Sequence, residues 1–395
     1  MILSDVCEFI VDCPHSTAPD EGEGYPLIRT PNVGKGRLDL NGVHRVSESV
    51  YKQRIQRGAP RANDLIFARE APAGNVALVQ ENQTVCLGQR TVLIRPNVQK
   101  VNPQYLVYYL LSPKPQYELL GTANGATVAH VNLPAIRNLK IELPEKSVQD
   151  KIGTILVTYD DLIENNQKQI KLLEEAAQRL YKEWFVDLRF PGYENTKIVG
   201  GVPEGWNWCK LEDAIQLDPK VTLTKERMKQ FIPMSALSTS SMVLDESQFT
   251  ETTSNSGSKF QNGDTLLARI TPCLENGKTA YVSGLKSDEG AVGSTEYIVM
   301  RAKTINSYMV YLLARTDDFR QSAINSMSGS DGRQRVKSDK LKMLDYLHPT
   351  SELVEKFENV AEPLFEKIRK LSKQMQQAKQ ARDLLLPKLM SGEVE

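Results

Sequence analysis

The sequence predicts an α+β protein in which two similar globular units, each a twisted sheet with short helices, are joined and spaced by two long antiparallel coiled-coil helices. Three observations predict this fold: two runs of heptads, a second set of motifs about 205 residues after the first, and dense turn signals between short strand patterns. We predict globular units over residues 1–144 and 192–345, and long helices over residues 145–191 and 346–395.

The two long helices are predicted by apolar residues at alternating steps of four and three. The same run returns 205 residues later, with one charged residue, Arg382, near its end. Strict heptads indicate a seam between two helices more than a single surface helix. The seam positions are Ile152, Leu156, Tyr159, Ile163, Asn166, Ile170, Leu173, Ala177, Leu180 and Trp184, then Phe357, Ala361, Leu364, Ile368, Leu371, Met375, Ala378, Leu385 and Leu389.

Three features of these helices have more than one interpretation. Asn166, opposite the repeat position of Leu371, is either a buried polar residue that fixes the helix register or a partly exposed residue in a loose stretch. Pro363 predicts a kink or a delayed start of the second helix. The outward charges of the first helix are either plain solvation or a docking surface, and they are Glu164, Lys168, Lys171, Glu174, Glu175, Lys182 and Glu183.

The globular units repeat several motifs in the same order. Each pair below combines a first-unit and a second-unit segment, and the offset drifts by a few residues, as loop insertions require. The pairs are Leu3–Asp5 with Leu211–Asp213, Asn63–Arg69 with Gly263–Arg269, Gly88 with Gly293, Tyr105–Tyr108 with Tyr308–Tyr311, and Leu139–Pro144 with Leu344–Pro349. The chain therefore alternates globular unit, long helix, globular unit, long helix.

Composition excludes several protein classes. Five cysteines without CxxC spacing argue against a disulfide or zinc framework and for a reducing compartment. No stretch approaches the roughly 20 apolar residues of a membrane span, so we expect a soluble, cytoplasmic protein without a membrane partner. Net charge is zero, but residues 1–144 hold 15 Lys/Arg against 13 Asp/Glu and residues 196–344 hold 19 against 17. The positive excess of the globular parts is small, so the isolated chain should bind DNA only modestly.

Catalytic motifs are not evident. The Gly-rich cofactor loop and the polar-Pro-Pro-aromatic tetrad of a methyltransferase are both missing from the sequence. Gly277-Lys278-Thr279 has the ending of a phosphate loop, but Pro272 stands where its first glycine is required. The four histidines show no metal spacing. We therefore expect a non-catalytic chain that binds neither metal nor cofactor.

Polar residues in the loops after matched strands are candidates for DNA contacts. Arginine can bind guanine, asparagine or glutamine can bind adenine, and serine or threonine can bind bases or phosphates. For any one of them a solvated loop residue is the simpler explanation, and Arg69 and Arg269 have a further alternative as strand-end anchors paired to Glu70 or another carboxylate. The candidates are Arg29, Thr30, Asn32, Arg69, Gln89, Arg90, Asn124, Thr127, Arg269, Thr271, Thr295, Arg333, Gln334 and Arg335.

This order of motifs resembles the specificity subunit (HsdS) of type I restriction–modification systems, over essentially the whole chain. The resemblance rests on five segments: the two strands that end at Arg69 and Arg269, Pro203–Trp206 before the second unit, Leu180–Phe185 closing the first long helix, and Arg382–Gly392 closing the second. One departure is that the first unit starts at Leu3 without the Pro-x-Gly-Trp segment that precedes the second unit.

The resemblance implies that each globular unit is a target recognition domain that reads one half of a bipartite double-stranded DNA site. The coiled coil would set the spacer and recruit two modification subunits that methylate adenine with S-adenosylmethionine. Restriction subunits would join to translocate and cut DNA, and ATP and Mg would bind to the partner subunits rather than to this chain.

Two other functions remain open from the sequence. A stand-alone, two-headed DNA-binding regulator would bind its site tightly and in a salt-sensitive manner without partners. A single-chain DNA methyltransferase or nuclease is disfavoured by the missing motifs, and binding of S-adenosylmethionine by the purified chain would revive it.

Overall fold

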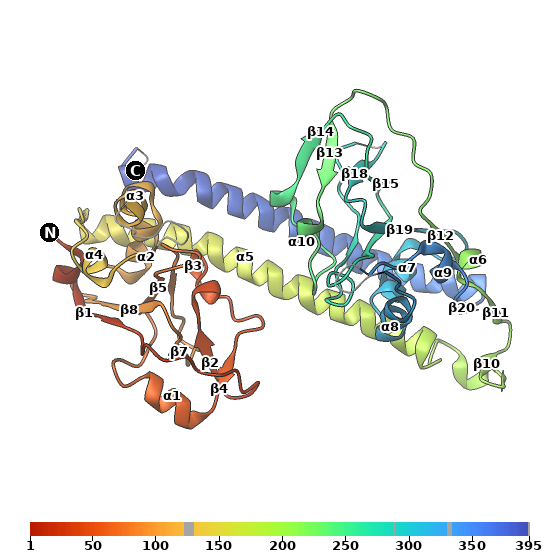
Figure 1. The fold of residues 1–395 in the computed structure, drawn as a ribbon, viewed down its shortest axis with the longest axis horizontal. Coiled ribbons are helices and arrows are strands. Elements are labelled where there is room, and N and C mark those ends of the chain that lie inside the picture. Colours follow the sequence, from red (N-terminus) through yellow and green to blue (C-terminus); the bar gives the residue numbers. More distant parts are fainter. Residues whose placement is uncertain (122–129, 288, 330–333, 394–395) are drawn as a thin grey trace. The chain divides into compact units, whose positions relative to one another are not determined.

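The computed structural model describes residues 1–121, 130–287, 289–329 and 334–393, which fold into two compact units. Unit 1 comprises Met1–Glu164 and Met375–Glu395, and unit 2 comprises Asn165–Gln374. Each unit has a head of strands and short helices together with part of both long helices (Figure 1). Because both long helices contribute to both units, the four-segment division of the chain stays a prediction.

The head of unit 1 contains a five-stranded sheet in the order β1-β8-β5-β6-β3, antiparallel except for the pair β3–β6. A second sheet, β4-β2-β7, combines one antiparallel and one parallel pairing. The strands are β1 (Cys7–Asp12), β2 (Tyr25–Ile28), β3 (Gly36–Arg37), β4 (Arg45–Val46), β5 (Leu65–Ala68), β6 (Val76–Leu78), β7 (Cys86–Leu87) and β8 (Thr91–Pro96). The helices are α1 (Glu48–Arg54), α2 (Pro103–Leu111), α3 (Pro113–Gly121) and α4 (Leu133–Arg137).

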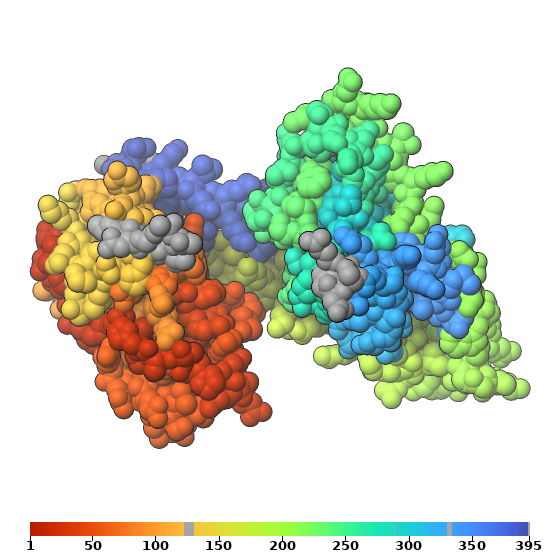
Figure 2. Space-filling view, viewed as in Figure 1, coloured from red at the N-terminus to blue at the C-terminus, as the bar shows by residue number. Residues whose placement is uncertain are grey.

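The head of unit 2 repeats this plan with a β12-β19-β16-β17 sheet and a β14-β13-β18-β15 sheet, and β13–β18 is again a parallel pair. Two short ladders, β9–β10 and β11–β20, complete it. The strands are β9 (Ile198–Val199), β10 (Val202–Pro203), β11 (Asn207–Lys210), β12 (Ile215–Leu217), β13 (Lys229–Ile232), β14 (Thr250–Thr252), β15 (Ser258–Phe260), β16 (Thr265–Ala268), β17 (Thr279–Tyr281), β18 (Ala291–Gly293), β19 (Tyr297–Ala302) and β20 (Asp345–His348). The helices are α6 (Leu211–Ala214), α7 (Ser307–Ala314), α8 (Asp317–Asn325) and α9 (Ser338–Lys342). In the space-filling view the residues of this head carry the green to light-blue colours (Figure 2).

The predicted repeat is confirmed by buried ion pairs at matched places. Asp64, at the start of β5, accepts two hydrogen bonds from Arg95 of β8, at 2.8 and 2.7 Å. Asp264, before β16, accepts two from Arg301 of β19, both at 2.7 Å. Both carboxylates are almost fully buried. A buried carboxylate requires such a partner. Each head therefore joins its central strands through the same bidentate arginine–carboxylate ion pair.

The paired glycines have a packing reason rather than a conformational one. A Cβ on Gly88 would lie 2.8 Å from the carbonyl oxygen of Ile28, and one on Gly293 would lie 2.6 Å from that of Ile232. Both contacts are closer than side-chain carbons tolerate. The repeated glycine therefore lets β2 approach the residue that follows β7 and lets β13 approach the last residue of β18.

The long helices α5 (Lys146–Tyr181) and α10 (Ser351–Ser391) pack along the predicted seam, antiparallel as expected. In unit 2, Asn166 faces Leu371, and Tyr181 lies against Phe357 with ring centroids 6.1 Å apart. Asn166 is 1% exposed, and its amide nitrogen donates to the carbonyl of Leu371 at 3.5 Å and to Gln374 Oε1 at 3.2 Å. The buried alternative for this residue is therefore the one observed.

Most seam positions are buried. The fully buried ones are Ile152, Leu156, Ile163, Asn166, Ile170, Ala177, Trp184, Phe357, Ala361, Ile368, Leu371, Ala378 and Leu389. The half-buried ones are Tyr159, Leu173, Leu180, Leu364, Met375, Arg382 and Leu385. No helix among the described residues combines the length and the apolar character needed to span a bilayer.

Two expectations about the helices are wrong. The delayed start at Pro363 does not occur, because α10 begins at Ser351 and its first turns are held by the buried residues Phe357 and Ala361. Glu174 does not point outward with the other charges of α5, since its Oε1 accepts hydrogen bonds from Ser241 Oγ at 2.7 Å and the Met242 amide at 2.9 Å. The head of unit 2 therefore covers that position of the helix. Helix α5 itself ends in a π-helical turn, Lys182–Val186.

Candidate nucleic-acid interface

An arginine at the end of the matched central strand organises the loops of each head. Arg69 Nε donates to the Val131 carbonyl at 2.8 Å, and Arg269 Nε and Nη2 donate to the Val336 carbonyl at 3.0 and 2.7 Å. The amides of the two valines donate back to the carbonyls of the same arginines, at 3.0 and 2.9 Å. Both arginines therefore act as strand-end anchors, but the predicted pairing with a carboxylate is found only for Arg69, with Asp12, whereas Arg269 is bonded to a backbone carbonyl. Each one ties the end of a strand to a segment that returns from a later loop.

In unit 1 this anchor is the centre of a charged network. Arg69 Nη1 pairs with Asp12 at 2.6 Å, and Arg69 Nη2 lies 2.7 Å from His130 Nε2. Because a guanidinium only donates, Nε2 accepts, and His130 Nδ1 donates to Glu70 at 2.5 Å. Glu70 also pairs with Arg90. Burial, with Arg69 and Arg90 nearby, lowers the pKa of His130, which keeps the imidazole neutral in this arrangement.

Unit 2 builds a shorter version of this network around the same strand end. Arg335 forms a two-pronged ion pair with Glu296, with nitrogen–oxygen distances of 2.7 to 3.0 Å. That hydrogen-bonded guanidinium lowers the pKa of Glu296. The Thr271 amide donates to the Gln334 carbonyl at 3.1 Å. Four predicted DNA-binding residues, Arg269, Thr271, Gln334 and Arg335, are therefore brought together.

The remaining candidates of unit 1 fall into two groups. Asn32 is buried and holds a turn, since its amide nitrogen donates to the Asp39 carbonyl at 3.3 Å. Thr30 Oγ1 donates to the Ala71 carbonyl at 3.3 Å, and Gln89 Nε2 donates to the His15 carbonyl at 3.2 Å. The other group consists of two arginines.

Arg90 and Arg29 form this second group. Arg90 has a half-exposed side chain and a backbone φ of 63°, a left-handed conformation that is strained for arginine. Arg29 Nε is buried without a hydrogen-bond partner among the described residues. Asn124, Thr127 and Arg333 lie outside the described residues.

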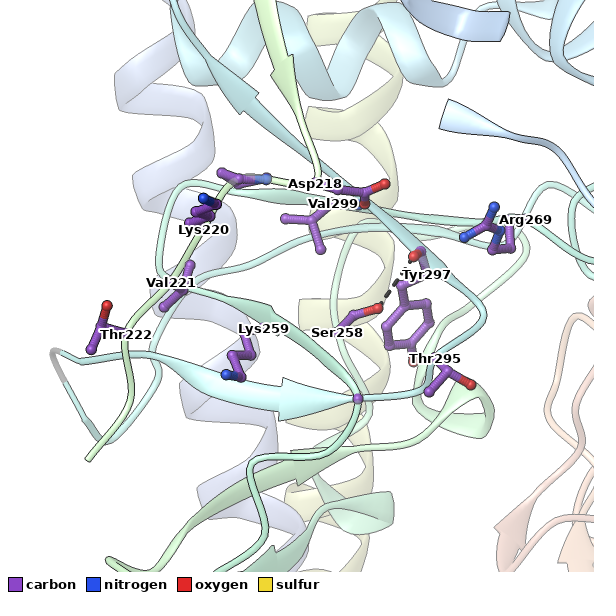
Figure 3. Close-up of a pocket in the computed structure, with 12 residues that line it drawn as sticks. Asp218, Lys220, Val221, Thr222, Ser258, Lys259, Arg269, Thr295, Tyr297 and Val299 are labelled. Atoms are coloured by element: carbon purple, nitrogen blue, oxygen red, sulfur yellow. Dashed lines mark hydrogen bonds between the residues drawn. The ribbon is translucent and has the colours of Figure 1, made fainter. Parts of the chain in front are cut away.

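A cationic groove in unit 2 was not predicted from the sequence. It has a volume of about 460 Å³, and Figure 3 shows its lining side chains. Two predicted residues, Arg269 and Thr295, line it together with Lys220 and Lys259. The two lysines lie 39 residues apart in segments outside the matched motifs, so the sequence offered no signal for them. Asp12 and His130 were also missed as network members, and Glu70, expected as a partner of Arg69, pairs with His130 and Arg90 instead.

Comparison with known proteins identifies relatives of one kind. Residues 1–175 match the family model described as "Type I restriction modification DNA specificity domain". The chain is 27% identical to the MjaIX type I restriction enzyme specificity subunit of Methanocaldococcus jannaschii, over 89% of this chain and 82% of that protein. It is 20% identical to the HindI specificity subunit of Haemophilus influenzae, over 85% of this chain and 87% of that protein.

A solved structure shares the fold. The S subunit of a type I restriction–modification system from M. genitalium superposes with a TM-score of 0.58 at 14% identity, covering 98% of this chain and 95% of that one. At this identity the likeness concerns the fold alone. It agrees with the two α+β heads and two long helices described above.

Proposed function

We propose that this chain, which is similar to type I restriction enzyme specificity subunits, is the DNA-recognition subunit of a type I restriction–modification complex. Each head reads one half of a bipartite site on double-stranded DNA. The long helices set the spacer between the halves and recruit two modification subunits, and restriction subunits join that assembly. The chain supplies sequence recognition in the cytoplasm and leaves methyl transfer, translocation and cleavage to its partners.

The observation that carries this proposal is the repeated strand-end anchor. In both heads a matched arginine fixes a loop that returns from later in the chain, through reciprocal hydrogen bonds with one residue, Val131 or Val336. Loops positioned by a sheet scaffold are typical of recognition surfaces. Two copies of one loop scaffold in a single chain suit a site with two separate halves.

Within this surface we assign different roles to the candidate residues. The buried or bonded side chains of Asn32, Arg69 and Arg269 shape the loops. The accessible Arg90 and Thr295, at matched positions 205 residues apart, are placed to contact DNA directly. Arginine at such a position contacts guanine edges, and removing such a contact costs about 1–3 kcal/mol of base discrimination.

The test is a genome-wide map of N6-methyladenine in cells that carry the modification subunit, with and without this chain. We expect a split motif that is methylated only when the chain is present. If no methylation depends on the chain, the proposal is wrong. Tight, sequence-specific binding by the chain alone would then favour the regulator, and S-adenosylmethionine binding would favour the methyltransferase.

A second experiment tests the division of labour. Residues 1–144 are exchanged for the matching unit of a relative, and the methylation motif is mapped again. The expected result is a change in one half-site while the other half stays the same. A change in both halves, or in neither, contradicts the assignment of one half to each head.

A further inference from the structure

The groove in unit 2 has an excess of positive charge. Lys220, Lys259 and Arg269 line it, against one carboxylate, that of Asp218. Neither lysine has a hydrogen-bonded or ion-pair partner among the described residues. The guanidinium of Arg269 is bonded to a neutral carbonyl, that of Val336. The groove therefore holds cations without an internal counterion for each of them.

The one acidic side chain is already committed to the fold. Asp218 Oδ1 accepts the amide hydrogen of Val299 at 3.0 Å, and Oδ2 accepts the hydroxyl of Ser338. Both oxygens thus serve the local backbone and a neighbouring helix, so neither lysine is neutralised by a direct contact with this group. An anion from outside the chain would supply the missing partner.

Gly257, in the lining of the groove, lets the backbone pack closely against β18. Its φ is +114°, and a Cβ at this position would lie 2.2 Å from the Gly293 carbonyl oxygen. Hydroxyl groups of Thr222 and Thr295 add hydrogen-bond donors along the lining, whereas the Ser258 hydroxyl donates to the Tyr297 carbonyl at 3.3 Å. Lysines, hydroxyls and close backbone are the groups that proteins use to hold phosphate oxygens.

The matched positions of unit 1 do not carry the two lysines. Ser258-Lys259-Phe260 precede Asp264 by four to six residues, and the same interval before Asp64 holds Gly58-Ala59-Pro60. Lys220 lies three residues after Leu217, which pairs with β19, and the equivalent residue after Ile10 is Cys13. The two lysines belong to unit 2 alone, so the groove is not a general property of the repeated scaffold.

We propose that this groove binds one or two phosphates of the DNA backbone beside the half-site read by unit 2, with Lys220 and Lys259 as the contacting cations. The inference rests on the proposed function and extends it to a site with no sequence preference. A lysine ammonium is a point charge that suits phosphate oxygens, and no Asn or Gln is found among the described lining residues to read a base edge. The contact therefore positions the head on the duplex and leaves the choice of sequence to the loops.

The test uses the full chain assembled with its modification subunits and a duplex that carries the methylated motif. Binding is measured from about 50 to about 200 mM salt for the wild type and for Lys220→Ala/Lys259→Ala. Loss of two phosphate contacts should flatten the slope of log affinity against log salt by about 2. The ratio of the variant's dissociation constant to that of the wild type should therefore fall about tenfold between about 50 and about 200 mM salt. The methylated motif should not change.

A matched control removes the same charge elsewhere in unit 2. Lys225 and Lys286 are exposed, lie outside the lining, and have no side-chain partner among the described residues. The slope for Lys225→Ala/Lys286→Ala should stay near the wild-type value. An equal flattening in this control would show a general charge effect and would overturn the groove assignment. Thermal unfolding of both variants confirms that their folds are intact.

Single neutral methylphosphonate linkages in the duplex locate the contact. We expect one or two positions near one half-site to weaken wild-type binding, and the Lys220→Ala/Lys259→Ala variant to be insensitive at those positions. If the variant remains as sensitive as the wild type, or if its methylation motif changes, the groove does not bind phosphates as proposed. If the wild-type complex itself binds no motif, the proposed function fails first.

Discussion

The two units attach their heads to the long helices at matched positions with opposite chemistry. With the offset of 205 residues, Asp160 on α5 is equivalent to Phe365 on α10. In the same way, Ala177 on α5 is equivalent to Arg382 on α10. Unit 1 therefore has an ion pair, Asp160 with Arg382, where unit 2 has an aromatic and a small apolar side chain. We call these contacts the ionic joint of unit 1 and the aromatic joint of unit 2.

The ionic joint is compact and fully bonded. Asp160 accepts from the Tyr108 hydroxyl at 2.5 Å and from Arg382 Nη1 at 2.6 Å, and its side chain is 2% exposed. Arg37 of the head pairs with the neighbouring Asp161. Burial raises the pKa of Tyr108, with the adjacent Asp160 adding to the effect, so the phenol stays protonated and donates.

The aromatic joint consists of tilted and edge-to-face ring contacts instead of an ion pair. Phe365 lies with ring centroids 4.7 Å from Tyr308, 5.0 Å from Tyr281 and 5.9 Å from Tyr311. Tyr311 occupies the repeat position in unit 2 that Tyr108 occupies in unit 1. The same position therefore carries a tyrosine in both joints, with different partners in each. The repeated fold thus tolerates either chemistry at this place, but the cost of losing one partner should differ. Charges must be removed in pairs, whereas apolar contacts can be removed one at a time.

The largest effect is expected from Asp160→Leu. It removes the buried partner of Arg382 and leaves the exposed Asp383, 2.8 Å away, as a second carboxylate partner, so we expect the lower end of the roughly 3–5 kcal/mol that breaking a buried ion pair costs. The measurement is denaturant unfolding, with hydrogen exchange used to follow residues 1–164 and 165–374 separately. The double variant Asp160→Leu/Arg382→Met should recover most of the loss, because an apolar pair of similar volume often replaces a buried ion pair without penalty. A double variant as unstable as the single one would contradict the ionic account.

A smaller loss in the same joint is expected from Gly36→Ala. Gly36 has a φ of +90°, and a Cβ there would lie 2.6 Å from Asp160 Oδ2 and 3.3 Å from a ring carbon of Tyr108. Strain of this kind costs about 1–3 kcal/mol. The control is Gly42→Ala, also at positive φ but with no atom within 4 Å, which isolates the cost of the backbone conformation. If both variants lose the same stability, the close packing against Asp160 contributes nothing.

Phe365→Leu in the aromatic joint should cost about 1–2 kcal/mol, less than the same replacement of Asp160. Leucine keeps most of the apolar contact and loses the edge-on ring interactions, which contribute about 0.5–1.5 kcal/mol per pair. The loss should be confined to hydrogen exchange in residues 165–374. A cost equal to that of Asp160→Leu would remove the distinction between the two joints.

The seam was predictable, but the ionic joint was not. Arg382 is visible in the sequence as a charge within a heptad, yet Asp160 lies one residue after the seam position Tyr159, which is only half-buried. A helix that packs on a head as well as on another helix has a wider buried stripe than the heptad describes. The same cause hid Glu174, whose burial depends on a loop 67 residues away.

The sequence predicted where the loop sites lie, but it did not predict which residues their side chains bond to. Strand-end arginines follow from the matched motifs, and anchoring was one of the two interpretations given to them. The partner of Arg69 is Asp12 rather than Glu70, because β1 reaches this end of the sheet through the order β1-β8-β5. Strand order depends on long-range pairing that a local period does not contain. Lys220 and Lys259 meet in one groove for the same reason.

The smallest expected effect concerns Glu174, the one carboxylate of α5 that the head of unit 2 covers. Burial raises its pKa, and repulsion from Glu175 raises it further. The hydrogen bonds from Ser241 and Met242 and the charge of Arg315 lower this pKa in part. A raised pKa in the folded state means that the folded form takes up the proton more readily than the unfolded form. The contribution of this group to stability is therefore present at low pH and is lost as the pH rises through its folded pKa.

Glu174→Gln tests this sign directly. The glutamine oxygen can still accept from Ser241 and Met242 but carries no charge, so the variant should be slightly more stable than the wild type at neutral pH. The advantage should shrink as the pH falls and the wild-type carboxyl becomes protonated. Glu175→Gln, an exposed neighbour, should show no such trend. The charge of Asp160 stabilises the ionic joint of unit 1, whereas the charge of Glu174 weakens its contact with the head of unit 2. A stabilising Glu174→Gln would therefore show that neutralising a buried carboxylate of α5 has opposite effects on stability in the two units.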